Sequence, residues 1–299
     1  MSSLSANQRG ILALIVGMTA YTINDAMVKS IAHRYPIGEV VFLRGLMTAA
    51  LIGIFVLALG HARELRFAIT RPVLIRSVFD GISTACFITA LVHMKLADLA
   101  AMLQVSPLII TAFSVLFYRE TVGWRRWAAI LVGFAGAMFV VKPTPSAFDA
   151  WALVALAAAT SSALREMQTR RIDRSIPTVI IAFMGSIGIL MTGAAFAAAG
   201  EWQPLATPDI AMLAGASVFV GIATYSIALA FRGVDLSVVA PFRYSYLLTS
   251  AIAGYLFFSE IPDGWSAIGA ILIVASGLYA LHREAVRLRE AGAPATPAA

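Results

Sequence analysis

The chain has 299 residues, of which 60% are hydrophobic and only 13% are Asp, Glu, Lys or Arg, whereas a soluble domain carries about 25% charged residues. Together with a mean hydropathy of +0.85, this excludes an ordinary soluble domain. The formal net charge of +6 would point to nucleic acid in a soluble protein. Here the basic residues stand between apolar runs, where they set membrane topology, so no nucleic-acid partner is expected. The single cysteine, Cys86, excludes an intramolecular disulfide.

Ten apolar runs have about the length that a helix needs to cross a bilayer, which is about 20 residues. They are long and continuous, without the alternation of a β-barrel strand, so an all-α membrane protein is predicted. The first run contains Asn24, Asp25 and Lys29 and lacks a cleavage pattern, so it is interpreted as a retained helix rather than a signal peptide. In chain order, the predicted spans are Ile11–Ile31, Glu39–Leu59, Pro72–Val92, Ala97–Tyr118, Trp124–Val141, Ala150–Met167, Pro177–Ala197, Pro208–Ala230, Leu236–Phe258 and Gly264–Leu281.

The distribution of Lys and Arg predicts the orientation. With ten spans, sixteen of the 22 Lys and Arg residues fall on the side of the two termini and four on the opposite side, while Arg44 and Arg243 lie within spans. Basic residues are enriched in cytoplasmic loops. We therefore expect a multi-pass protein of the bacterial inner membrane with both termini in the cytoplasm.

The second half of the chain repeats the first. Trp124 and Trp265 each begin an apolar run that contains Ala-Ile-Leu and a glycine at the same spacing, and Glu120 and Glu260 precede these runs at offsets of 140 to 141 residues. Five spans in each half give the halves opposite orientations, a design frequent in secondary transporters. The predicted domains are a first five-helix repeat over 1–146, a second over 147–282, and a disordered cytoplasmic tail over 283–299.

These marks are similar to those of a known family. Asn24 is followed by Lys29 in the first span, and Arg44 lies toward the start of the second. Pro107 precedes Glu120 by thirteen residues, and Glu120 and Glu260 each precede a helix that begins with Trp and contains glycine. The chain resembles the EamA type of the drug/metabolite transporter superfamily, and most of all its YddG-type exporters of aromatic amino acids and related metabolites. The resemblance implies two inverted five-helix repeats and the export or exchange of amino acids, other metabolites or cationic drugs. The second repeat departs from the first at Pro241 and Tyr246, so the halves are not equivalent.

Ionisable groups within a bilayer are costly and are read as functional by default. On the predicted outer side lie Asp25, Lys29, Glu39 and Arg44, and on the inner side Arg76, Asp80 and Arg243. Asp25/Lys29 and Arg76/Asp80 are each four residues apart and share a helix face. A carboxylate at Asp25 or Asp80 is a candidate for proton coupling, and an arginine is a candidate for holding a substrate carboxylate through two hydrogen bonds. Alternatively, the pairs neutralise each other, or Lys29, Glu39 and Arg76 reach the interface by snorkelling.

Proline, aromatic and hydroxyl residues predict the rest of a substrate cavity. Pro241 removes a helix hydrogen bond just before Arg243, Tyr244 and Tyr246, and this segment lines a cavity or belongs to an interfacial aromatic belt. Pro107 and the loop residues Glu120 and Glu260 are interpreted as structural. The remaining cavity candidates are Tyr21, Asn24, Phe79, Ser83, Gln104, Ser106, Tyr225 and Phe242, with Trp151, Thr160 and Ser161 as further possibilities.

The motifs that are missing narrow the function. There is no Gly-x4-Gly-Lys-Ser/Thr motif, no metal-ligand cluster of Cys and His, and no clustered nucleophile. Neither an ATP-driven pump nor an enzyme is therefore expected, and neither a cofactor nor a metal is expected.

The partners expected are the lipid bilayer and a small-molecule substrate, with the oligomeric state left open and a monomer as one alternative. The predicted function is a secondary transporter that exports amino acids and related metabolites or drugs by alternating access. The alternative is a lipid-head-group flippase or a passive channel.

Overall fold

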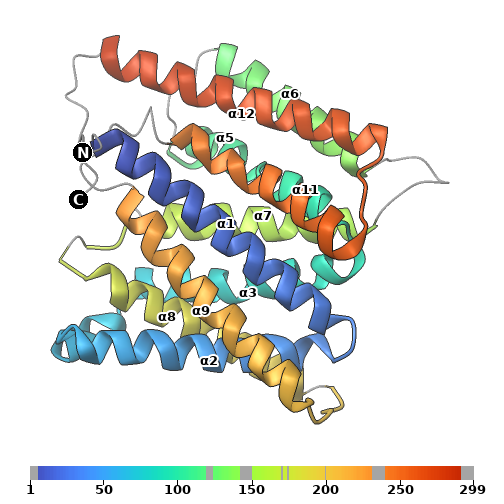
Figure 1. Cartoon of the computed structure of the whole chain (residues 1–299). Coiled ribbons are helices and arrows are strands. Elements are labelled where there is room, and N and C mark those ends of the chain that lie inside the picture. Colours follow the sequence, from blue (N-terminus) through green and yellow to red (C-terminus); the bar gives the residue numbers. More distant parts are fainter. Residues whose placement is uncertain are drawn as a thin grey trace, which may run out of the picture. The chain divides into compact units, whose positions relative to one another are not determined.

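A computed structural model of the chain describes residues 6–118, 124–141, 150–169, 171–173, 175–198, 200–230 and 240–290. Every regular element in these residues is a helix (Figure 1). In chain order, the elements are α1 (Ala6–Ala32), α2 (Ile37–Ala58), η1 (His61–Ala68), α3 (Arg71–His93), α4 (Leu96–Leu103), α5 (Ser106–Tyr118), α6 (Trp124–Val141), α7 (Ala150–Thr169), α8 (Thr178–Ala198), α9 (Thr207–Ala230), η2 (Ala240–Tyr244), α11 (Ser245–Phe258) and α12 (Gly264–Glu290).

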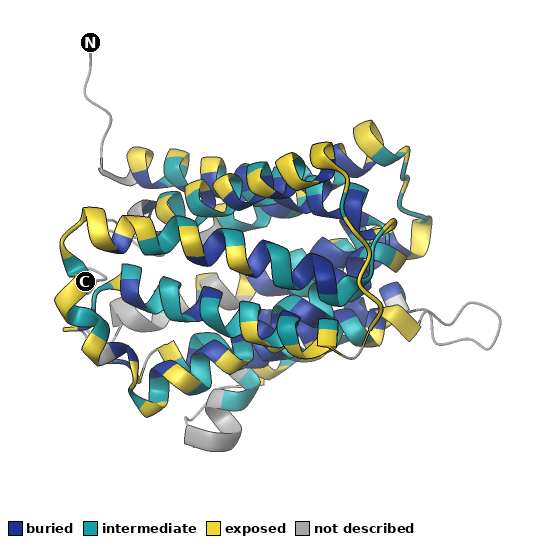
Figure 2. Ribbon diagram, turned by 90° about the horizontal axis from the view of Figure 1, so that it is seen from below, coloured by how far each residue is buried: buried dark blue, intermediate teal, exposed yellow. Residues whose placement is uncertain are grey.

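Five of the described helices are long and apolar enough to cross a membrane. The qualifying stretches lie in α1, α2, α3, α8 and α9, and shorter apolar helical stretches cover Leu96–Ile110, Trp127–Val140 and Gly264–Tyr279. Exposed residues run along the helices (Figure 2) and include large apolar side chains such as Leu131, Phe257 and Ile271. A surface of this kind suits lipid better than water. The all-helical prediction is therefore confirmed for the described residues, while ten spans in two inverted repeats stay a prediction.

The helices form two compact units, and each draws on both halves of the sequence. Unit one consists of Met1–Thr22, Lys95–Ala150 and Ile222–Ala299, and unit two of Ile23–Met94 and Trp151–Gly221. Each unit is described by itself below.

In unit two, α8 packs against both α2 and α3 (Figure 1). Glycines make the approach possible. A Cβ atom at Gly188 would lie 2.0 Å from the carbonyl oxygen of Ser77 on α3, and one at Gly193 would lie 2.4 Å from the backbone nitrogen of Phe42 on α2. Small residues at such interfaces let helix backbones come close, which stabilises packing where no hydrophobic effect operates between helices.

In unit one, α6 packs along α12 in the same manner (Figure 1). A Cβ at Gly136 would lie 2.8 Å from the Gly269 carbonyl oxygen, and a Cβ at Gly269 would lie 2.6 Å from the Gly136 carbonyl oxygen. Next to this contact, the rings of Phe139 and Trp265 stack with their centroids 5.5 Å apart. The two helices therefore touch backbone to backbone.

Two expectations from the sequence need correction. The predicted continuous span Ala97–Tyr118 is two helices, α4 and α5. Pro107 has no N–H to bond the carbonyl of Leu103, and the amide of Val105 bonds the carbonyl of Met102, three residues before it, instead of the carbonyl four residues before it. The last helix does not end at Leu281 but continues to Glu290. The first part of the tail, 283–290, is thus helical rather than disordered, since its Arg, Glu, Ala and Leu residues are good helix formers.

Candidate functional site

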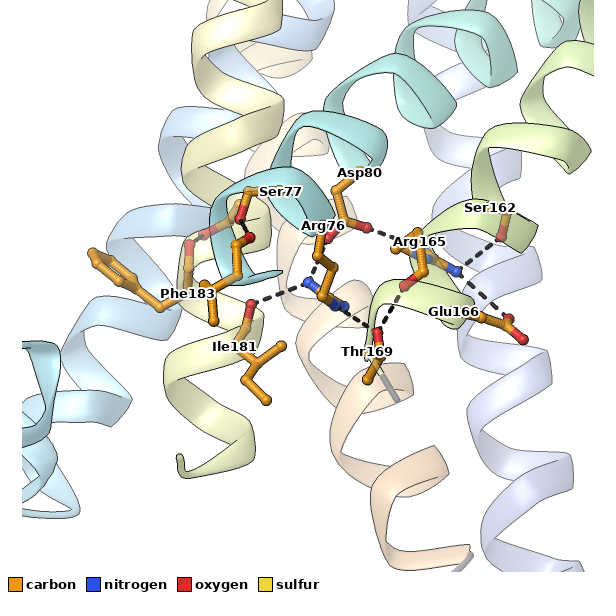
Figure 3. A network of polar contacts seen from close by, with 11 residues as sticks. Arg76, Ser77, Asp80, Ser162, Arg165, Glu166, Thr169, Ile181 and Phe183 are labelled. Carbon is orange, nitrogen blue, oxygen red and sulfur yellow. Dashed lines mark hydrogen bonds and ion pairs between the residues drawn. The ribbon is translucent and has the colours of Figure 1, made fainter. Parts of the chain in front are cut away.

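A charged network lies near the start of α3 in unit two (Figure 3). Arg76 and Asp80 stand one turn apart, and Nη1 of Arg76 donates to Oδ2 of Asp80 at 2.6 Å. The side chains are 15% and 10% exposed, respectively. The spacing of four residues predicted this pair, and the short distance in partial burial makes it a charge-assisted hydrogen bond of the stronger kind.

The same network reaches helices from the second half of the sequence. Arg165 on α7 donates from Nη1 to Oδ1 of Asp80 at 3.0 Å, so a single carboxylate binds two guanidinium groups. Arg76 also donates to Oγ1 of Thr169 on α7 at 3.0 Å and to the carbonyl of Ile181 on α8 at 3.2 Å. The network therefore joins α3, α7 and α8 through polar contacts.

Further neighbours of this network balance its charges and leave space for the Asp80 side chain. Nη2 of Arg165 donates to Oγ of Ser162 at 2.9 Å and lies 3.8 Å from the Glu166 carboxylate, so that two basic and two acidic side chains meet. A Cβ at Gly185 on α8 would lie 2.4 Å from Oδ2 of Asp80. Glycine at this position leaves the room that the ion pair occupies.

Arg165 was missed as a site residue in the sequence, where it counted only toward orientation. It nevertheless lies inside the predicted span Ala150–Met167, and an ionisable residue within a span is itself a signal of function.

A second polar cluster joins the end of α1 to the start of α9. Arg34 and Tyr35 donate to the two carboxylate oxygens of the buried Asp209, at 2.7 and 2.8 Å. The Tyr35 hydroxyl in turn accepts the backbone N–H of Ala206 at 3.2 Å. Asp209 was not among the predicted site residues.

Glu39 lies in the same region, at the start of α2. It is 1% exposed, and its Oε2 accepts the backbone N–H of Gln203 at 3.0 Å. Beside it, the rings of Phe42 and Trp202 meet edge to face. Gating and the snorkelling alternative for Glu39 both stay predictions.

The two clusters lie at opposite ends of unit two. Ile181, at the start of α8, belongs to the Arg76 network, whereas the far end of α8, at Ala198, leads into the segment that holds Gln203 and Ala206. A helix of 21 residues spans about 30 Å. That length matches the hydrocarbon core of a bilayer.

Further predicted residues of unit two are buried or half-buried. Nδ2 of Asn24 donates to Oδ1 of Asp25 at 2.7 Å, and Nζ of Lys29 donates to the carbonyl of Met94 at 2.6 Å. Arg44 is buried on α2, and Oγ of Ser83 donates to the carbonyl of Ala158 at 3.1 Å. Phe79 is half-buried one residue before Asp80.

The other predicted residues belong to unit one. Gln104 and Ser106 are buried where α4 gives way to α5, with Pro107 in the first turn of α5. Pro241, Phe242, Arg243 and Tyr244 form the turn η2, and Tyr246 follows in α11, where it packs in one cluster with Ala100; Tyr21 packs against the same cluster. Tyr225 on α9 is 72% exposed and stays a prediction.

Of the two glutamates that precede the Trp-led helices, the structure describes Glu260 but not Glu120. Oε2 of Glu260 accepts the backbone N–H of Leu96, the first residue of α4, at 2.8 Å, and a carboxylate there also suits the helix dipole. Glu120 lies outside the described residues. As for metals, no group of three or more His, Cys, Asp or Glu side chains gathers in the described part of the chain.

Comparison with known proteins supports a transporter. The model of the EamA-like transporter family matches residues 8–142 and, a second time, residues 149–281. The pseudopaline exporter CntI of Pseudomonas aeruginosa is 28% identical over 280 residues, which cover 89% of this chain and 94% of the exporter. The S-adenosylmethionine uptake transporter of Rickettsia bellii is 25% identical over 279 residues, which cover 92% of this chain and 94% of that transporter.

Two more similarities agree with these. The riboflavin transporter of Vibrio cholerae is 31% identical over 191 residues, or 63% of each chain. A protein of known crystal structure shares the fold with a TM-score of 0.61 at 22% identity, covering 93% of this chain and 98% of that one. The names of the three relatives give different solutes and do not single out an exporter of aromatic amino acids. The chain belongs to the EamA-like transporter family, whose relatives here are multi-pass membrane transporters and not enzymes.

Proposed function

We propose that this protein is a secondary transporter that carries a small organic solute across the bacterial inner membrane by alternating access, without ATP. The observation that carries the proposal is the pair of polar clusters at opposite ends of unit two. Each joins helices of the first half of the sequence to helices of the second half, through Asp80 at one end and Asp209 at the other. Contacts of this kind are able to hold one end of a path closed while the other end opens.

The Asp80 network is the proposed coupling gate. Separating α7 from α3 requires breaking the bond between Arg165 and Asp80, and this bond depends on the charge of the Asp80 carboxylate. The charged groups that face Asp80 are Arg76 from its own helix and Arg165 from α7, with Glu166 next to Arg165. A proton on Asp80 would cancel the attraction for both arginines, so proton binding favours opening at this end.

At the opposite end, the contacts of Arg34 and Tyr35 with Asp209 form the second gate. Because Asp209 is buried and accepts two hydrogen bonds, removing it from both partners costs free energy. If opening one gate favours closure of the other, the solute path is open to only one side of the membrane at a time. The two sequence repeats, proposed as inverted five-helix units with both termini in the cytoplasm, supply such a two-state arrangement.

The proposed solutes are amino acids, including aromatic ones, and related metabolites. The relatives' solutes widen this class to S-adenosylmethionine and riboflavin, which carry a heterocycle and a polar chain. Arg44 and Arg243 are the proposed partners for a solute carboxylate, since a guanidinium binds a carboxylate through two parallel hydrogen bonds. Asp25, Lys29 and Glu39, which are ionisable residues within or next to the predicted spans, are further proposed coupling or gating residues.

The test is uptake into proteoliposomes that hold the purified protein, with and without a pH gradient. Labelled phenylalanine, tryptophan, S-adenosylmethionine and riboflavin are the solutes. We expect saturable uptake of at least one of them, accelerated by the gradient in the wild-type protein but not in Asp80→Asn. Ser162→Ala removes a neighbour of the network without changing its charge and is the control. Uptake that rises linearly with concentration would instead indicate a channel, and transfer of labelled lipid between leaflets would indicate a flippase.

A further inference from the structure

Two helical segments of unit one depart from regular α-helix near corresponding positions of the repeat, and these two places are called the interruptions below. In the first half, α4 ends at Leu103 and α5 begins at Ser106, whereas in the second half the 3-10 helix η2 passes without a gap into α11 at Ser245. At the repeat offset of 140 residues, which relates Glu120 to Glu260, Gln104 corresponds to Tyr244. Each interruption has a proline within three residues of this position, Pro107 in one half and Pro241 in the other. Interrupted helices at equivalent places in two halves are a pointer to a transporter's binding site.

The two interruptions are also neighbours in space. α4 and α11 pack with opposite directions, because Leu96 at the start of α4 bonds Glu260 just past the end of α11, while Ala100 shares a cluster with Tyr246 at the start of α11. Leu103 packs against that cluster as well. The end of α4 therefore lies beside the junction of η2 and α11.

The depth of the two interruptions in the bilayer follows from the length of α4. Its eight residues rise about 12 Å, which is somewhat less than half of a hydrocarbon core of about 30 Å. The start of α4 is the charged end, where Lys95 donates to the carbonyl of Ile261 at 2.6 Å. With that end at the membrane surface, the interruptions lie close to the middle of the bilayer.

Three buried hydroxyl groups at these interruptions have no hydrogen-bond partner among the described residues. They are Oγ of Ser106, the phenolic oxygen of Tyr244 and Oγ of Ser245. Ser106 is only 3% exposed. A Cβ at Gly277 on α12 would lie 1.6 Å from the Tyr244 hydroxyl, so this hydroxyl fits only because residue 277 is glycine. Buried polar groups without partners are rare and destabilising, and each one calls for an explanation.

We propose that the paired interruptions form the subsite that binds the uncharged, hydrogen-bonding part of the solute, such as its hydroxyl groups or the edge of a heterocycle. The proposal rests on the transport function above. Hydroxyl groups donate and accept without carrying charge, so they match neutral polar atoms rather than a carboxylate or an ammonium group. The carbonyl of Leu103, which Pro107 deprives of its helical partner, adds an acceptor beside them.

The first experiment compares stability with binding, using riboflavin and S-adenosylmethionine as probes. The variants are Ser106→Ala, Ser245→Ala and Tyr244→Phe, and the control is Ser276→Ala, a buried serine of the same unit whose hydroxyl donates to the carbonyl of Ile273 at 2.9 Å. Without a probe, we expect the three variants to melt at or above the wild-type temperature, because no internal hydrogen bond is lost. The affinity for at least one probe should fall roughly 3- to 10-fold in each variant and stay unchanged in the control.

The second experiment needs no solute. Ser106→Cys, Ser245→Cys and Ser276→Cys are made in a Cys86→Ala protein, which removes the single native cysteine, and are treated in membranes with a small, polar methanethiosulfonate. Modification at the first two positions and not at the third is expected if the interruptions line the path.

The outcomes separate the two proposals. A wild-type protein that neither binds nor transports any tested solute overturns the proposed function, and labelling then still decides whether the interruptions line a path. Wild-type binding with unchanged affinity in all three hydroxyl variants, or unreactive cysteines at positions 106 and 245, overturns the subsite alone.

Discussion

Asp80 holds the two arginines of its network with one carboxylate. Arg76 is on its own helix and Arg165 on α7, at 2.6 and 3.0 Å. Removing one partner from a buried ion pair leaves an uncompensated charge, whereas replacing the whole pair is much less costly. Asp80 should therefore be the most sensitive of the three positions, because its loss leaves two positive charges without their common partner.

The first prediction is a double-mutant cycle at this network. Asp80→Asn should lower the free energy of unfolding by about 3 kcal/mol, and Arg165→Gln by less, since that side chain is 30% exposed. The double variant should be less destabilised than the sum, with a coupling of about 1–2 kcal/mol. Unfolding by sodium dodecyl sulfate in mixed micelles measures all three. Strict additivity would show that the two side chains do not interact in the folded protein.

Glu260 acts at the residue scale on a helix end. Its carboxylate accepts the Leu96 N–H, one of the amides that α4 itself leaves without a partner. We predict that Glu260→Ala lowers the free energy of unfolding by about 1 kcal/mol, while Glu260→Gln, which keeps an acceptor oxygen, costs less. The same detergent titration measures both. A loss of equal size in the two variants would mean that the charge, and not the hydrogen bond, matters.

Helices of this protein meet through glycine. The contacts of α8 with α2 and α3 and of α6 with α12 bring backbone atoms to distances that leave no room for a methyl group. Where the neighbouring atom belongs to a backbone, it is unable to rotate away, so the helices themselves must move apart. Packing at these elements is for this reason sensitive to single methyl groups.

The third prediction tests this at α8. Gly188→Ala would place its Cβ 2.0 Å from the Ser77 carbonyl oxygen, and we expect a loss of about 3 kcal/mol together with a lower melting temperature. Gly264→Ala is the control, because a Cβ there meets nothing within 4 Å. Melting in detergent, followed by size-exclusion chromatography, compares them. If Gly188→Ala melted like Gly264→Ala, the tight contact between α8 and α3 would be wrong.

At the scale of the whole molecule, the orientation of the chain is the prediction still to be tested. Sixteen basic residues on one side and four on the other place the segment after α7 in the cytoplasm and the segment after α8 outside. Both segments contain exposed residues, Ser175 in the first and Glu201 in the second. They lie at opposite ends of α8.

The fourth prediction follows. In a Cys86→Ala protein, Glu201→Cys should react with a membrane-impermeant maleimide in intact cells, and Ser175→Cys should react only after the inner membrane is opened. Both variants should support the same uptake as the parent. The reverse labelling pattern would invert the proposed orientation, and labelling of both in intact cells would contradict an odd number of crossings between them.

The sequence predicts features that depend on residues close together in the chain better than contacts between residues far apart in it. Apolar runs of bilayer length indicated helices because helix formation and burial in lipid are local properties of about 20 residues. The spacing of Arg76 and Asp80 predicted their contact, since i and i+4 share a helix face. Pro107 was noted, yet the predicted span was drawn through it, because proline is tolerated in membrane helices and its effect depends on the neighbours.

What the sequence determined by itself is the membrane class, the helical content and the charged residues within the spans. The tertiary structure decided which partners they have: Arg165 reaches Asp80 across 85 positions and Arg34 reaches Asp209 across 175. It also brought the ends of α4 and η2 side by side in unit one. No periodicity encodes such pairings, because they arise from helices packing through glycine contacts between residues far apart in the chain.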